Sequence, residues 1–541
     1  MLDFDEVELF HDAEHQRMKE EARAWPTIDV YDKNWVHVTR LAAEIAGDCE
    51  DICNDAGEAN FPMYASNPVA EWLSEEVEEE EDVHLIIEQS RTRWAGKVRK
   101  IGEVMESDGL EYSRVNAIHV FDQCKHVYCY PNPLFPIQIQ APKIFAWAGS
   151  AKTGILLLLF LNLMRQFAPV WRLPDNPFDP QSWRDSLDPS KWPMIIDPRG
   201  LGWYDTSEWT VFATRMGNFY DLVRPILDDS GLQLIGEQWM PGDPQPFPEW
   251  VILTQPILIW RIVDKSGVRG PTGTLIDGAI RYVARVADDL VSEVTEAVPW
   301  VDPPEYMAQG WFGTKPEAPA VVWYSAQKYA IEGGTGASGI TGWERNVHKG
   351  LAKAVVTGGK SPGWVNSSVK LIANAILGYI GAIFLNPGLA LGVFDKYIED
   401  VFLAWARIEN RPRGQKMGKY ANLEHFETAD NGFGLSTLTA IRTGFFKTRA
   451  YTSFRVSVIN GAPYFVGYHL ANGDRVSAEN GRSRKLYTDQ IRALKLTWSR
   501  EQDPNWAISI GVDDDEQMPT ARLGRQLEHV RTIVQAVSVS S

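Results

Sequence analysis

The alternation of apolar and polar residues divides the chain into two strand-rich regions with mixed material between them. Residues 3–24 are densely charged, with apolar residues at helical spacing, and the following Trp25-Pro26 predicts that this amphipathic helical arm ends there. From Thr27 the apolar period changes to two, which is typical of half-buried strands. The predicted strands lie at 28–30, 35–38, 83–88, 94–103 and 112–121.

The second strand-rich region lies near the C-terminus. Residues 451–459 and 464–470 flank Asn460-Gly461, and this dipeptide between two apolar runs predicts a β-hairpin. Alternating apolar residues within 494–498 and 506–510 predict two further strands. A short C-terminal helix is expected after the acidic run at 513–516, because acidic residues favour a helix N-terminus.

Two apolar segments interrupt the alternating pattern. Residues 154–164 are too few to span a bilayer and predict a buried helix. Residues 371–394 carry no charge and are long enough to span one, but the turn signature Asn386-Pro387-Gly388 splits them, which favours a buried helical hairpin. A membrane-active segment and a permanent membrane anchor are the alternatives. The candidate contact residues of this apolar hairpin are Leu371, Ile376, Leu377, Gly378, Ile380, Gly381, Ile383, Phe384, Leu385, Gly388, Leu391 and Gly392.

These patterns predict an α+β multidomain chain of 541 residues, which is long enough to bury several cores. The expected boundaries are a charged helical arm at 1–25, a β domain at 26–135, a mixed α/β insertion with the buried apolar helix at 136–345, a helical region with the apolar hairpin at 346–440, a second β domain at 441–512 and a C-terminal helix at 513–541.

Composition narrows the possible partners. The chain has 53 Lys and Arg against 71 Asp and Glu, and its net charge of -18 argues against nucleic acid or an anionic membrane as the main partner, because both require a basic surface. The N-terminus lacks a basic stretch followed by an apolar one, so we expect no secretory signal. The 21 Trp residues indicate extensive subunit contacts, sugar stacking or ordinary core filling.

Motifs that would indicate a metal or cofactor are incomplete. Cys49 with Cys53, and Cys124 with Cys129, lack the C-x2-C spacing typical of zinc, so we interpret them as reduced, half-buried thiols. His11, Glu14 and His15 fit H-x-x-E-H, but on a charged terminal arm. The stretch 358–361 resembles a phosphate-binding loop without its first glycine, and the acidic run 74–82 lacks the spacing of a calcium loop. We therefore predict no metal, no cofactor and no catalytic residues.

Several segments together resemble the minor tail protein family of long-tailed phages that infect actinobacteria, the tail-tip or baseplate hub class of siphoviruses. In order they are RWAG at 93–96, YPNPLFP at 130–136 with APK at 141–143, FLNL at 160–163, TGGKSP at 357–362, FLAWA at 402–406, and GFFKTR at 444–449 leading to Asn460-Gly461. They extend over most of residues 27–512. The match is weaker between about 175 and 345, and the acidic arm departs from the family.

The resemblance implies a virion protein of the tail tip. It implies a homotrimeric hub in which each chain carries two tube-like β-barrel domains with helical and mixed insertions, so that three chains present a pseudo-sixfold ring to the tail tube. The implied partners are distal tail or tail-tube proteins, the tape measure protein and other tip or fibre proteins. DNA would pass through the hub without specific binding, and host membrane contact would be transient.

Three expectations follow from this resemblance. The excess of acidic residues gives the channel a negative wall that DNA slides past. The 371–394 hairpins of three chains close or line the tip through their glycines, which permit close helix approach. The Trp residues lie mainly at subunit interfaces.

Two alternatives of other classes stay open. A virion-associated cell-wall hydrolase, or a carbohydrate-binding tip protein, would use the Trp residues for sugar stacking, and a hydrolase would carry a carboxylate pair in a cleft between domains. A membrane-anchored protein would use residues 371–394 as its anchor.

Overall fold

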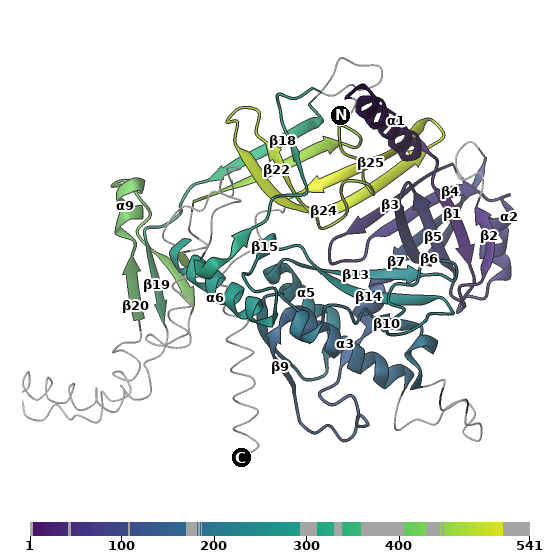
Figure 1. Ribbon diagram of the computed structural model, residues 1–541, viewed down its shortest axis with the longest axis horizontal. Coiled ribbons are helices and arrows are strands. Elements are labelled where there is room, and N and C mark those ends of the chain that lie inside the picture. The colour runs from purple at the N-terminus through teal and green to yellow at the C-terminus, as the bar shows by residue number, and fades with distance from the viewer. Residues whose placement is uncertain are drawn as a thin grey trace, which may run out of the picture.

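The computed structural model describes residues 4–41, 45–105, 109–168, 187–292, 311–328, 338–358, 405–428 and 450–511, together with residues 181, 184, 444, 445 and 448. Its centre is a thirteen-stranded sheet with the order β18-β22-β25-β24-β3-β4-β7-β6-β5-β1-β2, to which β23 and then β17 are added beside β24. Figure 1 shows this sheet across the upper part of the molecule, with the helices α3, α5 and α6 below it.

The N-terminal half of the sheet confirms four of the five strands expected there. The strand expected at 35–38 begins at His37, and two further strands, at 46–52 and 58–64, were not predicted. The strands of this half are β1 (Thr27–Tyr31), β2 (His37–Leu41), β3 (Ala46–Ile52), β4 (Glu58–Tyr64), β5 (His84–Gln89), β6 (Thr92–Met105) and β7 (Glu111–His119). β6 and β7 pair antiparallel as far as Met105 opposite Glu111, and Gly109, between the two strands in the chain, has a φ of 81°, which suits glycine. The helix α2 (Pro68–Glu71) precedes the acidic run, which begins in one turn at Trp72–Glu76 and continues in turns and coil.

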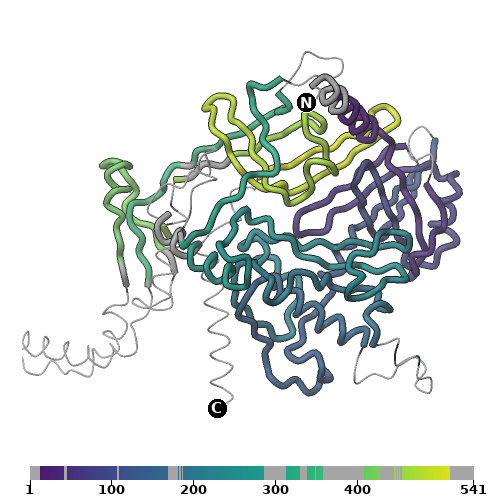
Figure 2. The backbone as a smooth tube through the Cα atoms, in the orientation of Figure 1, coloured from purple at the N-terminus to yellow at the C-terminus, as the bar shows by residue number. Residues whose placement is uncertain are grey.

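The C-terminal half is formed by strands from a later part of the chain. They are β17 (Val321–Trp323), β18 (Ile340–His348), β22 (Tyr451–Ile459), β23 (Arg475–Glu479), β24 (Leu486–Ser499) and β25 (Gln502–Ile510). Leu494, Leu496 and Trp498 are buried on one face of β24, as their alternation predicted. Figure 2 shows the two halves side by side, in purple and in yellow.

The predicted hairpin around Asn460-Gly461 is wrong. β22 pairs with β18 and β25, and residues 464–470 form turns. The physical reason is that Asn460 closes a loop with its side chain, whose oxygen accepts a hydrogen bond from the Val466 N–H at 2.9 Å. Val466 and Leu470 are then buried in the core as loop residues.

The mixed insertion forms a second layer. Its elements are β8 (Tyr128–Cys129), β9 (Phe145–Ser150), α3 (Ala151–Phe167), β10 (Met194–Ile196), β11 (Trp209–Thr214), β12 (Gly217–Asn218), α5 (Phe219–Ser230), β13 (Leu232–Trp239), β14 (Ile257–Asp264), β15 (Val268–Arg269), α6 (Leu275–Ser292) and β16 (Lys315–Pro316). The apolar segment 154–164 lies within α3, and Ile155, Leu156, Leu158 and Leu159 are fully buried, which confirms the predicted buried helix.

The described part of 346–440, residues 346–358 and 405–428, is mainly β-structure where a helical region was expected, and for the other residues of that region helical structure stays a prediction. The described part contains β19 (Ala354–Gly358), β20 (Trp405–Glu409), the short helix α9 (Arg411–Met417) and β21 (His425–Thr428), and the three strands form a sheet of their own. The sequence reason is local, because the β-branched Val355, Val356 and Thr357 favour a strand. Figure 1 shows this small sheet projecting at one side of the molecule.

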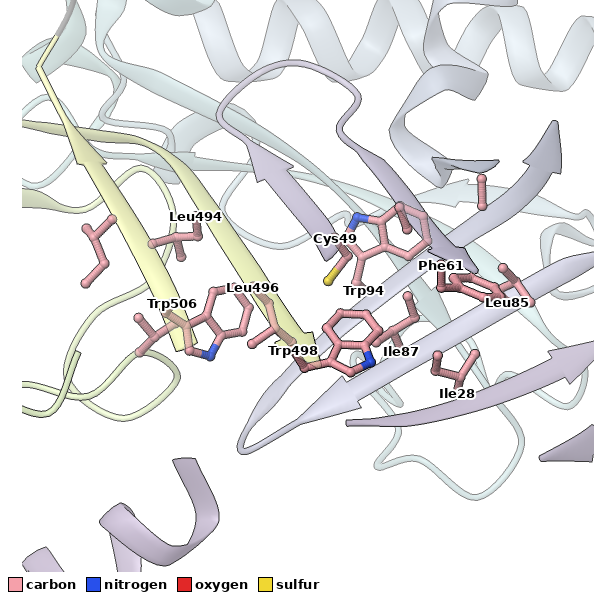
Figure 3. Packing of buried hydrophobic residues seen from close by; sticks show 14 of the residues in the cluster. Ile28, Cys49, Phe61, Leu85, Ile87, Trp94, Leu494, Leu496, Trp498 and Trp506 are labelled. Carbon is pink, nitrogen blue, oxygen red and sulfur yellow. The ribbon is translucent and has the colours of Figure 1, made fainter. Parts of the chain in front are cut away.

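Two hydrophobic cores lie on opposite faces of the N-terminal half of the sheet. Leu85 and Ile87 of β5 point into the first core, which also contains Leu496 and Trp498 of β24. Ile86, between them, belongs to the second core, with α3 and α5. Figure 3 shows side chains of both halves of the sheet meeting in the first core. The described strand pairings do not close either half into a barrel, so two separate barrels stay a prediction.

Candidate functional site: the seam and the two edges of the sheet

The two halves of the sheet meet in a seam of backbone pairing. β24 pairs antiparallel with β3, from Ala493 opposite Ile52 to Ser499 opposite Ala46. Trp498 covers Gly47, where an added Cβ would lie 2.2 Å from the indole ring, so only glycine permits this approach. Because both the ladder and the core are shared across the seam, we expect the two halves to behave as one body.

Gln89 joins three elements beside the seam. It ends β5 and is 3% exposed, its oxygen accepts a hydrogen bond from Trp506 Nε1 of β25 at 2.8 Å, and its Nε2 donates to the Ala22 carbonyl at 2.6 Å. The helix α1 (Phe4–Arg23) is therefore tied to both halves of the sheet. The sequence predicted this helix correctly, and Ala22 is the only buried one among its described side chains, but its contacts with the sheet were not predicted.

The contacts of α1 with the C-terminal half of the sheet join residues that are distant in the sequence. The Tyr468 hydroxyl hydrogen-bonds to the Glu21 carboxylate, and His15 lies edge-on to Phe465 with ring centroids 5.3 Å apart. The partners of Glu21 and His15 lie more than 440 residues away along the chain, so no local pattern could have predicted them.

A polar junction fixes the insertion against the seam. Asn54 follows β3 with a left-handed φ of 56°, and its side chain donates to the Leu232 carbonyl at 2.9 Å and accepts from the Leu234 N–H at 2.8 Å. Asn54, which belongs to the N-terminal half of the sheet, thus hydrogen-bonds to the backbone of β13 in the insertion. Asn472 donates to the Asp51 carbonyl at 3.1 Å, and Lys265 forms an ion pair with Asp474.

Two carboxylates, Asp228 of this junction and Asp489 of β24, lie in surroundings that disfavour their charged form. Burial raises the pKa of Asp228 above its usual range, against the opposing effect of Arg492. Burial also raises the pKa of Asp489, although the Gln490 N–H donates to that carboxylate at 2.7 Å. Both groups favour the protonated form more than a solvated carboxylate does, because a charge inside the protein loses its hydration.

Along its main path the sheet ends in two open edges, and β17, on the branch beside β24, is a third described strand that pairs with one neighbour alone. In the described part of the chain, β2 pairs with β1 alone and β18 with β22 alone, so each presents one unpaired side. Figure 1 places these strands at opposite ends of the sheet. Unpaired strand edges offer backbone groups to another chain. Trp343 and Val347 of β18, and Val38 of β2, are exposed at these edges.

The edge strand β2 is fixed to β1 by a charged contact. Arg40 donates two hydrogen bonds of 2.8 Å to the carboxylate of Asp29, and His37 Nε2 lies 3.2 Å from the same group. The hydrogen bond with Arg40 lowers the pKa of Asp29 more than any other favourable contact. This bidentate pair holds the edge in register.

The apolar hairpin 371–394 and all its candidate residues lie outside the described residues. The small sheet nevertheless shows where the chain leaves the described structure before the apolar hairpin and where it returns after it. Gly358, the last residue of β19, pairs with Trp405, the first residue of β20. Residues 359–404 are therefore inserted between two neighbouring positions of a strand pair.

None of the other candidate motifs forms a site in the part of the chain that the structure describes. All four cysteines are free and buried, more deeply than the half-buried thiols expected, and burial raises the pKa of Cys53 and Cys129 to about 12. Among the described residues, no group of three or more His, Cys, Asp or Glu side chains is placed to hold a metal ion. Residues 359–361 of the phosphate-loop stretch, and the His11 side chain, lie outside the described part. None of the described helices is long and apolar enough to cross a membrane.

The Trp residues divide between core and surface. Those buried within the chain are Trp94, Trp192, Trp239, Trp260, Trp323, Trp498 and Trp506. Those exposed are Trp25, Trp203, Trp209, Trp250 and Trp343. Core filling therefore explains a large share of the surplus, and the location of the others at subunit interfaces stays a prediction.

Sequence reasoning missed Gln89 and Asn54, the side chains that tie the seam together. Gln89 had a signal, because Leu85, Ile87 and Gln89 alternate on one face of β5 and the last position of that apolar row is polar. A polar residue in such a row indicates a buried hydrogen bond. Asn54 had only a weak signal, since asparagine tolerates the left-handed region more readily than most residues.

Comparison with known proteins decides the family. The model of the Siphovirus ReqiPepy6 Gp37-like protein family matches residues 27–512. The chain belongs to this family. It is a minor tail protein of a siphovirus, a component of the virion tail.

Two curated relatives agree with the family assignment. The chain is 28% identical to the minor tail protein Gp28 of Mycobacterium phage D29 over 550 residues, covering 90% of each chain. It is 27% identical to the minor tail protein Gp28 of Mycobacterium phage L5, covering 96% of this chain and 94% of the relative. The resemblance seen in the sequence motifs is thus confirmed.

Solved structures are more distant. A tail protein from Neisseria meningitidis MC58 gives a TM-score of 0.38 at 8% identity, covering 91% of this chain and 97% of that one. The prophage tail protein gp18 from Listeria monocytogenes EGD-e gives 0.35 at 11% identity, covering 93% and 99%. Similarity of this degree carries no argument about architecture or function.

Proposed function

We propose that this minor tail protein is a structural hub of the tail tip, that three copies form a ring, and that the ring joins the tail tube to the tip and lines or closes the channel for DNA. The observation that carries the proposal is the single sheet, in which two halves from distant parts of the chain lie side by side and the strands at the two ends of the main path, β2 and β18, each pair with one neighbour. Each half would serve as one tube-like unit, so that three chains supply six.

The edges give the ring a physical basis. If β18 of one copy pairs with β2 of the next, the contact is head-to-tail, and such contacts form a closed ring when the rotation between copies closes. The backbone groups along the two edges would then be paired around the ring, which removes an exposed edge that otherwise promotes aggregation.

The proposal assigns two further roles. The apolar segment 371–394, carried between β19 and β20, would close or line the tip and contact the host membrane transiently. The excess of acidic residues would give the channel a negative wall, so that DNA passes without specific binding. The partners would be tail-tube or distal tail proteins, the tape measure protein and other tip or fibre proteins, and no enzymatic step is assigned.

Cross-linking of the two edges tests the ring. The native thiols are buried and their pKa values are raised, so thiolate is scarce and cysteines added at exposed positions react selectively. Phage particles would carry the chain with both Val38→Cys in β2 and Val347→Cys in β18, at positions that are 42% and 45% exposed, and a short bis-maleimide would join neighbouring edges. The expected product is a covalent trimer.

Each single substitution is the matched control. Neither can join β2 to β18, so neither should give the trimer band. Absence of that band from the double variant, with both thiols labelled by a monofunctional maleimide, would contradict edge-to-edge pairing in the ring.

A further inference from the structure

A loop on the insertion exposes an unusual set of apolar side chains. The connection between β8 and β9 carries Leu134, Phe135, Ile137 and Ile139, which are 49%, 40%, 53% and 63% exposed. We call these four residues the apolar loop. Residues 130–142 contain no charged side chain, although the chain as a whole carries 53 basic and 71 acidic residues. Apolar side chains gathered without charges are typical of binding surfaces.

Hydrogen bonds within the connection hold its shape. The Asn132 N–H donates to Gln140 Oε1 at 2.9 Å, and Gln140 Nε2 donates to the carbonyls of Phe135 and Pro136 at 3.0 Å. Asn132 Nδ2 donates to the Ala141 carbonyl at 2.7 Å. Polar side chains thus satisfy backbone groups beside the apolar loop, which lowers the cost of moving it out of water.

The base of the connection is anchored on α3. The Tyr130 N–H donates to Asn162 Oδ1 at 3.0 Å, and Arg165 lies over the Tyr130 ring, 3.8 Å from its centre. Pro131 and Pro133 are buried next to this anchor. A loop that is already ordered loses little conformational entropy when it binds, so its apolar contacts convert more fully into affinity.

Area and charge restrict what can cover the loop. Four half-exposed side chains supply much less than the about 800 Å² per partner of a standard interface, so they cannot hold two free copies of the chain together. An anionic membrane surface is disfavoured by the net charge of -18. The partner that fits the loop is a protein with an uncharged, apolar pocket. Other contacts must already hold this protein near the loop.

We propose that the apolar loop is a docking contact for a neighbouring, different tail protein with such a pocket. Figure 1 shows the segment leading into β9 at the end of the molecule opposite β18 and β22. The contact therefore lies away from β18, one of the two edges assigned to the ring. It rests on the chain being a tail protein and not on its forming a trimer.

Photo-cross-linking in assembled particles tests the proposal. A photo-reactive amino acid replaces Ile137, and after irradiation the cross-linked partner is identified by mass spectrometry. The expected result is a cross-link to one other tail protein, and the same photo-reactive residue in place of Ile252, which is 63% exposed on another loop, should not give it. A cross-link from position 137 to a second copy of this chain, or to no tail protein, would overturn the proposal.

A polar variant supplies the second readout. Phe135→Ser with Ile137→Ser should reduce incorporation of the chain into particles at least tenfold while leaving its melting temperature unchanged, whereas Ile252→Ser should do neither. Normal incorporation of the double variant would contradict the docking role. Flotation of the wild-type chain, but not the double variant, with phosphatidylglycerol-containing vesicles would identify a membrane as the true partner and would equally overturn the proposal. Failure of these tests leaves the ring untouched, because cross-linking of the sheet edges reports on the ring separately.

Discussion

At the scale of single residues, the joint between the two halves of the sheet depends on a few buried polar groups. Gln89 accepts from Trp506 and donates to the backbone of Ala22, so one amide serves both halves and α1. Buried hydrogen bonds of this kind add little net free energy when made, but an orphaned partner is costly. The arrangement therefore predicts large effects from small substitutions.

Replacing Gln89 by leucine should destabilise the chain more than its size suggests. The change leaves the Trp506 N–H and the Ala22 carbonyl without their partner, and two orphaned buried groups cost about 2–4 kcal/mol. Urea unfolding measures the difference, and Gln138→Leu, at an exposed position, is the control. Equal stability of the Gln89 variant and the wild type would show that the two hydrogen bonds of Gln89 contribute nothing to the free energy of unfolding.

The Asp29–Arg40 pair should make the attachment of β2 depend on pH. The pair stabilises the fold fully at pH values above the pKa of Asp29 in the unfolded chain, which is about 4. This stabilisation is lost as pH falls through the lowered pKa of Asp29 in the folded chain. Arg40→Gln should lower the free energy of unfolding by only about 1 kcal/mol at pH 7, since the Arg40 side chain is 60% exposed. Melting curves of both proteins should converge near pH 2, and a constant difference across pH would count against the ion pair.

At the scale of elements, strands with clear alternation were predictable and their partners were not. The apolar positions of β24 and β25 were read correctly, because burial on one face imposes a period of two. The hairpin predicted from Asn460-Gly461 was wrong, because the Asn460 side chain accepts a hydrogen bond from the Val466 N–H and closes a loop where a hairpin turn was expected. The seam itself pairs residues more than 440 positions apart, and no local pattern specifies such a pairing.

Removing residues 359–404 should leave the fold intact. Gly358 and Trp405 are already paired, so an Asn-Gly turn joining them would keep β19 and β20 in register. The shortened chain should melt within a few degrees of the wild type and assemble into particles, and those particles should lose infectivity.

Collapse of that shortened chain would contradict the proposed role of the apolar segment. It would mean that residues 371–394 fill a core of the chain itself, and the reason for placing them at the tip would disappear. An equal-length replacement of 359–404 by a Gly/Ser linker separates loss of the apolar residues from loss of length.

At the scale of the whole molecule, the polar junction between the insertion and the seam should make stability fall toward alkaline pH. Burial raises the pKa of Asp489 in the folded chain above its pKa in the unfolded chain. The contribution of Asp489 to the free energy of unfolding is therefore fully present below the unfolded pKa and is lost as pH rises through the folded pKa. Asp489→Asn keeps an oxygen for the Gln490 N–H and removes the charge. The variant should melt higher than the wild type at pH 8 and equally at pH 3, and a lower melting temperature at pH 8 would contradict this assignment.

The central claim is the ring of three copies, and electron cryomicroscopy of the tail end tests it most directly. The account predicts three copies of this chain around the tail axis, each contributing both halves of its sheet, with β18 of one copy beside β2 of the next. Six copies, a single copy, or three copies whose sheet edges face solvent would contradict it.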